Sequence, residues 1–326
     1  MEKKRIIAFD YIRSICVIYI VGIWHLNNYL SPSLRFNGKV SFVLESIVVA
    51  VLATFSFVSG YFMRKYSFHS IRDVLLYYKK RFLRFWPLFF LASLGLYLIH
   101  WMDFKQFLLC VTGLSLFTAT PVKTLWYISM LMPLYFVATP IIGYKAETFR
   151  QRLIRAFFMF LLVFILVALG ISDRKLLLYS PLYFAGLLSR DIRLPFTKSL
   201  LVFISSSMIF ILGLFFLKRA ISFNQLSYLF SIFGTSSIIA FGFLLPKSRW
   251  TDNMFQRIAY ASMAAYLFHR LFFGVVLFIC WQQKEGEPYL SVFIACMTFI
   301  LSLIGAWVIQ RVYDIIVQKL QLSDRA

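Results

Sequence analysis

The stretch FDYIRSICVIYIVGIWHLNNY, Phe9 to Tyr29, decides the fold class of this chain. About 20 mostly apolar residues cross the hydrocarbon core of a bilayer as one helix, and this stretch is long and apolar enough to do so. It also carries Asp10, Arg13 and His25. An Asp or Arg at the centre of a membrane helix costs about 2.5–3.5 kcal/mol, so these residues indicate a protein interior or a functional site.

The rest of the chain shares this apolar character. Of its 326 residues, 61% are hydrophobic, and the mean hydropathy is +0.79. A soluble domain is about half apolar. No hydrophilic stretch is long enough for a soluble domain, so we expect one membrane domain over residues 1–326. The N-terminal apolar run is too long for a signal peptide and lacks a small-residue cleavage site, which favours an uncleaved first span.

Hydropathy predicts an all-α fold, a polytopic membrane helix bundle of about ten transmembrane helices. The segment 105–118 is apolar but short, and we expect it to be re-entrant or interfacial. The predicted spans lie at about 7–31, 40–63, 85–101, 124–143, 156–171, 176–189, 199–217, 226–245, 258–281 and 290–310.

The net charge of +21 is distributed unevenly over the predicted loops. With the N-terminus in the cytoplasm, 23 of the 34 Lys and Arg residues fall in cytoplasmic segments and 9 fall outside. The positive-inside rule therefore predicts that both termini are cytoplasmic. Topology accounts for most of this charge, so we expect no nucleic-acid partner. The four cysteines lack metal or redox spacing, and no zinc motif appears, so we expect no metal.

Within the first span, Asp10 and Arg13 share a helix face and can pair, which would only anchor the span. His25 lies twelve residues beyond Arg13, about 18 Å along a straight α-helix, so the two cannot touch. A lone histidine in a span is often a packing residue. Glu45, near the outer end of the second span, offers a partner at the depth of His25. A carboxylate on one ring nitrogen would leave the other as a base.

The acidic residue, basic residue and histidine of the first span resemble the opening of the acyltransferase family 3 membrane proteins. The usual family form has ten residues between the basic residue and the histidine, whereas eleven separate Arg13 from His25 here. Five further stretches are similar to family motifs and occur in the expected order. They are FSFVSGYFMRK (55–65), KKRFLRFWPLF (79–89), LWYISMLMPLYFVATP (125–140), LYFAGLLSR (182–190) and IAYASMAAYLFHR (258–270).

The resemblance implies an O-acyltransferase of the plasma (inner) membrane. Such enzymes move an acyl group, often acetyl, from acyl-CoA to acceptors such as cell-surface saccharides. The expected co-substrate is acetyl-CoA from the cytoplasm, and the expected acceptor is a hydroxyl of an envelope saccharide or lipid-linked glycan. A coenzyme A head held at the inner face could extend its arm towards His25.

The resemblance and the local chemistry together suggest roles for individual residues. We expect His25 to act as the general base, with Glu45 and His269 as further catalytic residues. Basic residues near span ends suit the diphosphate of coenzyme A, and small residues suit its thin arm. The predicted donor-binding residues are Arg13, Arg64, Arg81, Arg84, Ser59 and Gly60, and the predicted acceptor- or thioester-binding residues are Trp126 and Arg270.

Each of these assignments has a simpler alternative. The arginines could be topological anchors, Ser59 and Gly60 could serve helix packing, Trp126 could belong to an interfacial aromatic belt, and His269 with Arg270 could be a buried stabilising pair. At the level of function, the alternatives are a transporter or flippase of a lipid-linked saccharide, or a structural membrane partner. A transporter would usually show internal repeats and broken helices, and the sequence shows neither.

Overall fold

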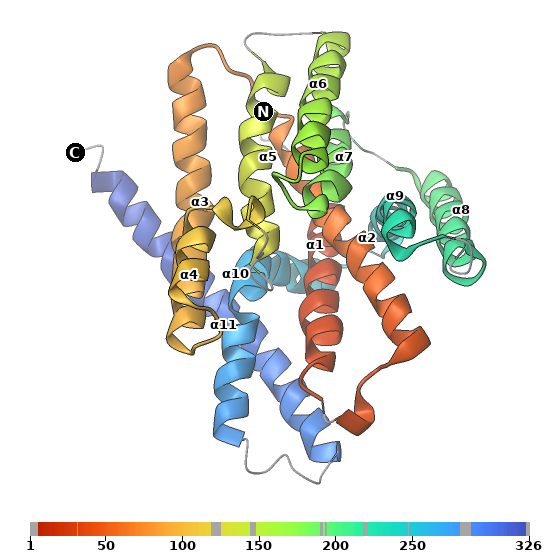
Figure 1. Cartoon of the computed structure of the whole chain (residues 1–326), viewed down its shortest axis with the longest axis vertical. Helices are drawn as coiled ribbons and strands as arrows, with labels where there is room; N and C mark the ends of the chain where they lie inside the picture. Colours follow the sequence, from red (N-terminus) through yellow and green to blue (C-terminus); the bar gives the residue numbers. More distant parts are fainter. Residues whose placement is uncertain are drawn as a thin grey trace. The chain divides into compact units, whose positions relative to one another are not determined.

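The computed structural model describes residues 6–30, 32–118, 125–143, 148–189, 192, 194–217, 221–246, 248–280 and 288–323. Every element in these ranges is a helix, which confirms the all-α prediction (Figure 1). Positions 31, 124, 190 and 281, at which predicted spans or motifs begin or end, lie outside these ranges. The α-helices are α1 Ile7–Tyr19, α2 Gly38–Met63, α3 Ile71–Leu98, α4 Phe104–Val111, α5 Trp126–Ile142, α6 Phe149–Ala168, α7 Arg174–Leu188, α8 Phe196–Phe215, α9 Phe223–Leu244, α10 Arg249–Cys280 and α11 Pro288–Ser323.

Each predicted span coincides with a helix. Among the described residues, eight helical segments are long and apolar enough to cross a membrane, which confirms a polytopic membrane bundle. The first of them, Ile7–His25, combines α1 with the π-helical turn η1, Ile20–His25. The other two predicted spans correspond to α5 and α7, which are shorter, at 17 and 15 residues. The cytoplasmic location of both termini stays a prediction.

Three helices begin well before the predicted spans. The predicted loop 64–84 is largely the first part of α3, α6 begins at Phe149 rather than near 156, and α10 begins at Arg249 rather than near 258. A capping box starts α3: the Ser70 hydroxyl accepts a hydrogen bond from the Asp73 amide at 3.2 Å, and the Asp73 carboxylate accepts one from the Ser70 amide at 2.9 Å. Hydropathy detects only the apolar part of a helix, whereas the cap sets its first turn.

The short apolar segment 105–118 forms α4 and a 3-10 turn at Leu114–Leu116. A capping box between Asp103 and Gln106 fixes the start of α4. Eight residues of α-helix extend about 12 Å, less than half the hydrocarbon thickness, so α4 cannot cross the membrane. Its re-entrant or interfacial location stays a prediction.

The chain divides into two compact units, residues 1–48 with 239–326, and residues 49–238. In the first unit, α10 and α11 lie side by side (Figure 1). Tyr260 bonds to Asp314, while the Phe272 ring lies against Gly305. Because these partner numbers run in opposite directions along the two helices, α10 and α11 are antiparallel.

The first helix packs along α10 in the same unit. The Tyr11 hydroxyl donates to an Asp252 carboxylate oxygen at 2.8 Å, and the Tyr29 ring stacks on Phe273 with centroids 4.4 Å apart. The partner numbers rise together, so the two helices are parallel. This pairing brings residues from opposite ends of the sequence side by side.

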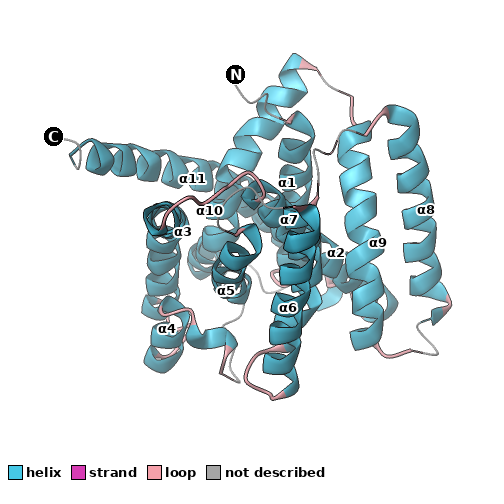
Figure 2. Ribbon diagram, turned by 90° about the horizontal axis from the view of Figure 1, so that it is seen from above, coloured by secondary structure: helices cyan, strands magenta, loops and turns pink. Residues whose placement is uncertain are grey.

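The second unit contains a close crossing of α2 and α7. A Cβ atom added at Gly60 would overlap the carbonyl oxygen of Tyr183, and one added at Gly186 would overlap that of Phe57. Each glycine therefore lets the backbone of the other helix approach. In the same unit, α8 and α9 lie side by side and share a Ser206–Ser237 hydrogen bond of 2.8 Å (Figure 2).

We expect Gly60→Ala to lower stability by about 1–3 kcal/mol, because the added methyl group must push two backbones apart. The measurement is the thermal unfolding midpoint of the purified protein in detergent. Ser59→Ala is the matched control, since it removes only a hydroxyl from the neighbouring half-buried position. Equal midpoints for Gly60→Ala and the wild type would show that the crossing tolerates a side chain.

Candidate active site in the α1–α10 pair

The first span is not a regular α-helix. After α1, residues Ile20–His25 form the π-helical turn η1. Backbone bonds in a π-helix run from i to i+5, so one such turn takes up one more residue than an α-turn. The axial distance and rotation expected between Arg13 and His25 from a straight α-helix therefore do not apply. The His25 side chain therefore points in the direction that position 24 would have in an uninterrupted α-helix.

His25 is buried and bound to an arginine of α10. An Arg270 guanidinium nitrogen lies 3.2 Å from His25 Nδ1, and His25 is only 8% exposed. A guanidinium group can donate hydrogen bonds but cannot accept them. Nδ1 is therefore the acceptor, and the neutral ring of His25 carries its proton on Nε2.

His269 lies beside His25 and has the opposite tautomer. Its Nδ1 is 2.8 Å from the Tyr266 carbonyl oxygen and 3.1 Å from that of Ala265. Carbonyl oxygens only accept, so Nδ1 carries the proton and Nε2 carries the lone pair. This Nε2 is buried and has no hydrogen-bond partner in the described part of the chain. The two imidazole centroids are 4.6 Å apart, with the rings tilted by 40°.

The expected partnership between Glu45 and His25 is not formed. The Glu45 side chain is exposed, and the His25 nitrogen predicted to meet a carboxylate accepts from Arg270 instead. Arg13 donates to the Ser262 hydroxyl of α10 at 2.8 Å. The structure thus brings His25, His269 and Arg270 together, and we call them the His25–His269–Arg270 cluster.

Sequence reasoning missed Ser262 and Tyr29. Ser262 lies in the quoted stretch IAYASMAAYLFHR, eight residues before Arg270, but nothing in a sequence identifies the helix that it faces. Tyr29 lies near the end of the predicted first span and is 8% exposed. Its ring stacks on Phe273, three residues after Arg270 on α10. Tyr29 therefore packs beside the cluster.

In the second unit, Arg81 of α3 is surrounded by tyrosines. Its guanidinium carbon lies 5.4, 5.6 and 5.3 Å from the ring centroids of Tyr66, Tyr77 and Tyr135. Its Nε is buried without a hydrogen-bond partner among the described residues. We call these three rings the tyrosine cage. Aromatic faces stabilise a cation, but they leave its hydrogen-bond donors unused.

The other predicted donor-binding residues lie in different surroundings. Arg64 sits 4.2 Å from the Tyr61 ring centroid and donates to the hydroxyl of Tyr61 at 3.0 Å. Arg84 is exposed, three residues after Arg81 on the same helix. Gly60 lies at the crossing with α7, so helix packing explains its surroundings.

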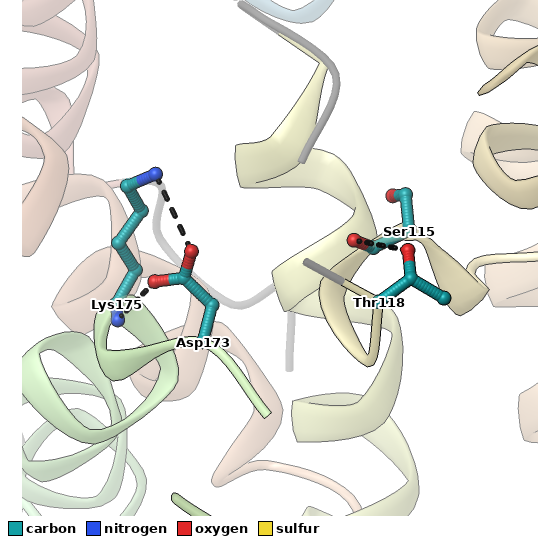
Figure 3. Close-up of polar contacts among 4 residues, drawn as sticks. All are labelled: Ser115, Thr118, Asp173 and Lys175. Atoms are coloured by element: carbon teal, nitrogen blue, oxygen red, sulfur yellow. Dashed lines mark hydrogen bonds and ion pairs between the residues drawn. The ribbon is translucent and has the colours of Figure 1, made fainter. Parts of the chain in front are cut away.

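Trp126 begins α5 and is partly covered by a cation. The Lys175 ammonium lies 4.7 Å from the Trp126 ring centroid. It also lies 3.6 Å from an Asp173 carboxylate oxygen (Figure 3). Figure 3 also shows Thr118 donating to the Ser115 carbonyl oxygen, at 3.3 Å. One face of Trp126 is therefore in contact with Lys175, which also pairs with Asp173.

The His25–His269–Arg270 cluster can perform acid–base chemistry. It combines a buried ring nitrogen that accepts a proton, a ring N–H that donates a hydrogen bond, and a fixed positive charge. In the described part of the chain, no group of three or more His, Cys, Asp or Glu residues could hold a metal ion. Its two ring nitrogens of opposite character and the Arg270 charge suit proton transfer to and from a bound hydroxyl.

The family model for an acyltransferase domain, that of acyltransferase family 3, matches residues 6–311. No curated protein and no solved structure gives a significant match to the chain. The matched range includes the whole of the His25–His269–Arg270 cluster and the tyrosine cage. The chain therefore belongs to acyltransferase family 3.

Proposed function

We propose that this membrane acyltransferase moves an acyl group from acyl-CoA to a hydroxyl of an envelope saccharide or lipid-linked glycan. The acyl group that we propose is acetyl. The observation that supports this most directly is the His25–His269–Arg270 cluster. It holds an unpartnered basic nitrogen, His269 Nε2, in a buried position. A buried lone pair of this kind does not stabilise packing, and it can accept the proton of a hydroxyl group.

Acyl transfer to a hydroxyl needs a base, because a saccharide hydroxyl is a weak nucleophile when neutral. A positioned general base contributes about 10²–10⁴-fold to the rate. Burial of the cluster also keeps water from competing for the thioester. The sequence pointed to His25 as this base, and His25 and His269 are the two candidates within the cluster.

The tyrosine cage supports a site for the acyl donor. A buried cationic group is costly unless it is paired, and the Nε of the half-buried Arg81 is buried without a hydrogen-bond partner among the described residues. A diphosphate would supply the missing acceptors through charge-assisted hydrogen bonds. We propose that Arg81 binds a phosphate of acyl-CoA, with Arg64 and Arg84 contributing positive charge.

For Arg81→Met we expect the KM for acyl-CoA to rise roughly 10–150-fold with kcat little changed, because a hydrogen bond to a charged group contributes about 1.5–3 kcal/mol. Steady-state kinetics in membranes measure both constants. Arg72→Met, an exposed arginine on the same helix, is the control and should leave KM unchanged. A fall in kcat at constant KM would place Arg81 outside the donor site.

The function itself is tested with membranes and labelled acetyl-CoA. Label should enter the saccharide or lipid fraction with the wild type, and His25→Ala should reduce transfer by at least roughly 100-fold at matched expression. His69→Ala, at an exposed histidine outside the cluster, should transfer normally. Wild-type membranes that transfer no label from acetyl-CoA or from longer acyl-CoAs would contradict the proposal.

A further inference from the structure

We propose that His269, and not His25, accepts the proton of the acceptor hydroxyl, while His25 donates its Nε2–H to the thioester carbonyl oxygen and Arg270 fixes His25 in that tautomer. This division of roles rests on the proposed function. It follows from the hydrogen-bond partners of the two rings, which differ in kind.

At His269, the protonated nitrogen and the basic nitrogen are assigned by the backbone. Two carbonyl oxygens, from Tyr266 and Ala265, take the Nδ1–H. The basic nitrogen must then be Nε2, which is buried and without a partner among the residues that the structure describes. When Nε2 gains a proton, the Nδ1–H bonds to these carbonyls remain and strengthen, because hydrogen bonds from a charged donor are stronger.

At His25 the two nitrogens are exchanged: Nδ1 is the basic nitrogen and Nε2 carries the proton. This arrangement argues against a role as the general base. Its only basic nitrogen in this tautomer is Nδ1, which already accepts from Arg270 at 3.2 Å. A proton added there would place an imidazolium cation against a guanidinium cation, and like charges at this distance disfavour ionisation. The free function of His25 is the Nε2–H, which can only donate.

The two rings lie 4.6 Å apart, close enough to serve one reacting group. The acceptor hydroxyl gives its proton to His269 Nε2 as its oxygen forms a bond to the thioester carbonyl carbon. The carbonyl oxygen gains negative charge, which His25 Nε2–H stabilises. The carbon–sulfur bond then breaks, the coenzyme A thiolate takes the proton from His269, and the ester and free coenzyme A are released.

Transfer to two different nucleophiles can distinguish a general base from a hydrogen-bond donor. A membrane saccharide hydroxyl needs a base, whereas hydroxylamine is nucleophilic when neutral and does not. We would measure acetyl transfer from acetyl-CoA to both, in membranes carrying the full chain, for His269→Gln, His25→Asn and His25→Gln. The Gln amide reaches near the position of histidine Nε2, whereas the Asn amide reaches only near Nδ1. His69→Gln is the matched control.

We expect His269→Gln to lose about 10²–10⁴-fold in transfer to the hydroxyl and to stay within about tenfold of wild type with hydroxylamine. We expect His25→Asn to lose about 10²–10³-fold with both nucleophiles, and His25→Gln to recover at least about tenfold relative to Asn. The two His25 variants test the assignment independently should His269→Gln fail to accumulate.

The opposite pattern would overturn the assignment. If both His25 variants lose transfer to the hydroxyl equally and keep transfer to hydroxylamine, His25 is the base. If His269→Gln keeps transfer to the hydroxyl, His269 is not the base. An active wild type with either pattern refutes only this division of roles, whereas a wild type that uses neither nucleophile refutes the proposed function as well.

Discussion

Inserting one alanine after Cys16 is expected to reduce acyl transfer by at least about 10²-fold. One extra residue rotates the two flanking parts of an α-helix by about 100° relative to each other. Upstream, the Ser14 hydroxyl donates to the Phe255 carbonyl oxygen at 2.8 Å, and Tyr11 is bound to Asp252. These bonds hold the first turns against α10. The rotation therefore turns the part of the helix after the insertion and moves His25 away from Arg270. The measurement is labelled acetyl transfer at matched protein level.

Deleting Ile23 is the matched control, and it should keep at least about a tenth of the activity. Ile23 is 40% exposed and lies within the π-helical turn. Losing one residue there converts an i→i+5 turn into an α-turn, and the residues on either side keep their facing. If the deletion abolished activity as fully as the insertion, the π-turn would not simply absorb one extra residue while keeping the facing of His25.

The sequence predicted the positions of the membrane helices well, because each helix contains a long apolar core. It failed at the starts of α3, α6 and α10. There the helices continue into polar segments, where capping residues and not hydropathy set the ends. The capping box of Ser70 and Asp73 was legible in the sequence, but a hydropathy window does not detect it.

The sequence predicted which residues form the candidate site, but it did not predict which of them contact each other. His25, His269 and Arg270 were all identified as costly residues within spans. Depth in the membrane suggested Glu45 as the partner of His25, but depth leaves open both which helix is adjacent and which face it presents. The parallel pairing of α1 with α10 joins residues 245 positions apart, and the π-turn changes the facing of His25. Neither feature has a hydropathy signal.

The small residues of α2 show a similar limit. Ser59 and Gly60 indicated a close approach of two backbones, which could serve a tunnel or a helix crossing. In the structure Gly60 meets α7, where Gly186 makes the reciprocal approach. The sequence could identify Gly60 as a place of close contact, but the second glycine, 126 positions later, becomes meaningful only once the two helices are seen to cross.

Arg270→Ala is expected to lower kcat by about 10²-fold, with the same loss for the saccharide hydroxyl and for hydroxylamine. Arg270 acts through His25 as a positioning residue: without its guanidinium, the imidazole is free to change tautomer and to withdraw its Nε2–H from the thioester oxygen. Steady-state kinetics with both nucleophiles measure this loss. Arg257→Ala, at an exposed position of the same helix, is the control.

Guanidinium ion distinguishes positioning from a purely structural role of Arg270. Added at millimolar concentration, it should restore at least about tenfold of the lost activity of Arg270→Ala, because it can occupy the vacated space and donate to His25 Nδ1. It should leave the wild type and Arg257→Ala unchanged. A variant that guanidinium does not restore and that also unfolds at a lower temperature would show that Arg270 stabilises the helix pair without orienting His25. His25 would then need another residue to hold its tautomer, and Tyr29, which lies close to Arg270, is the first to substitute.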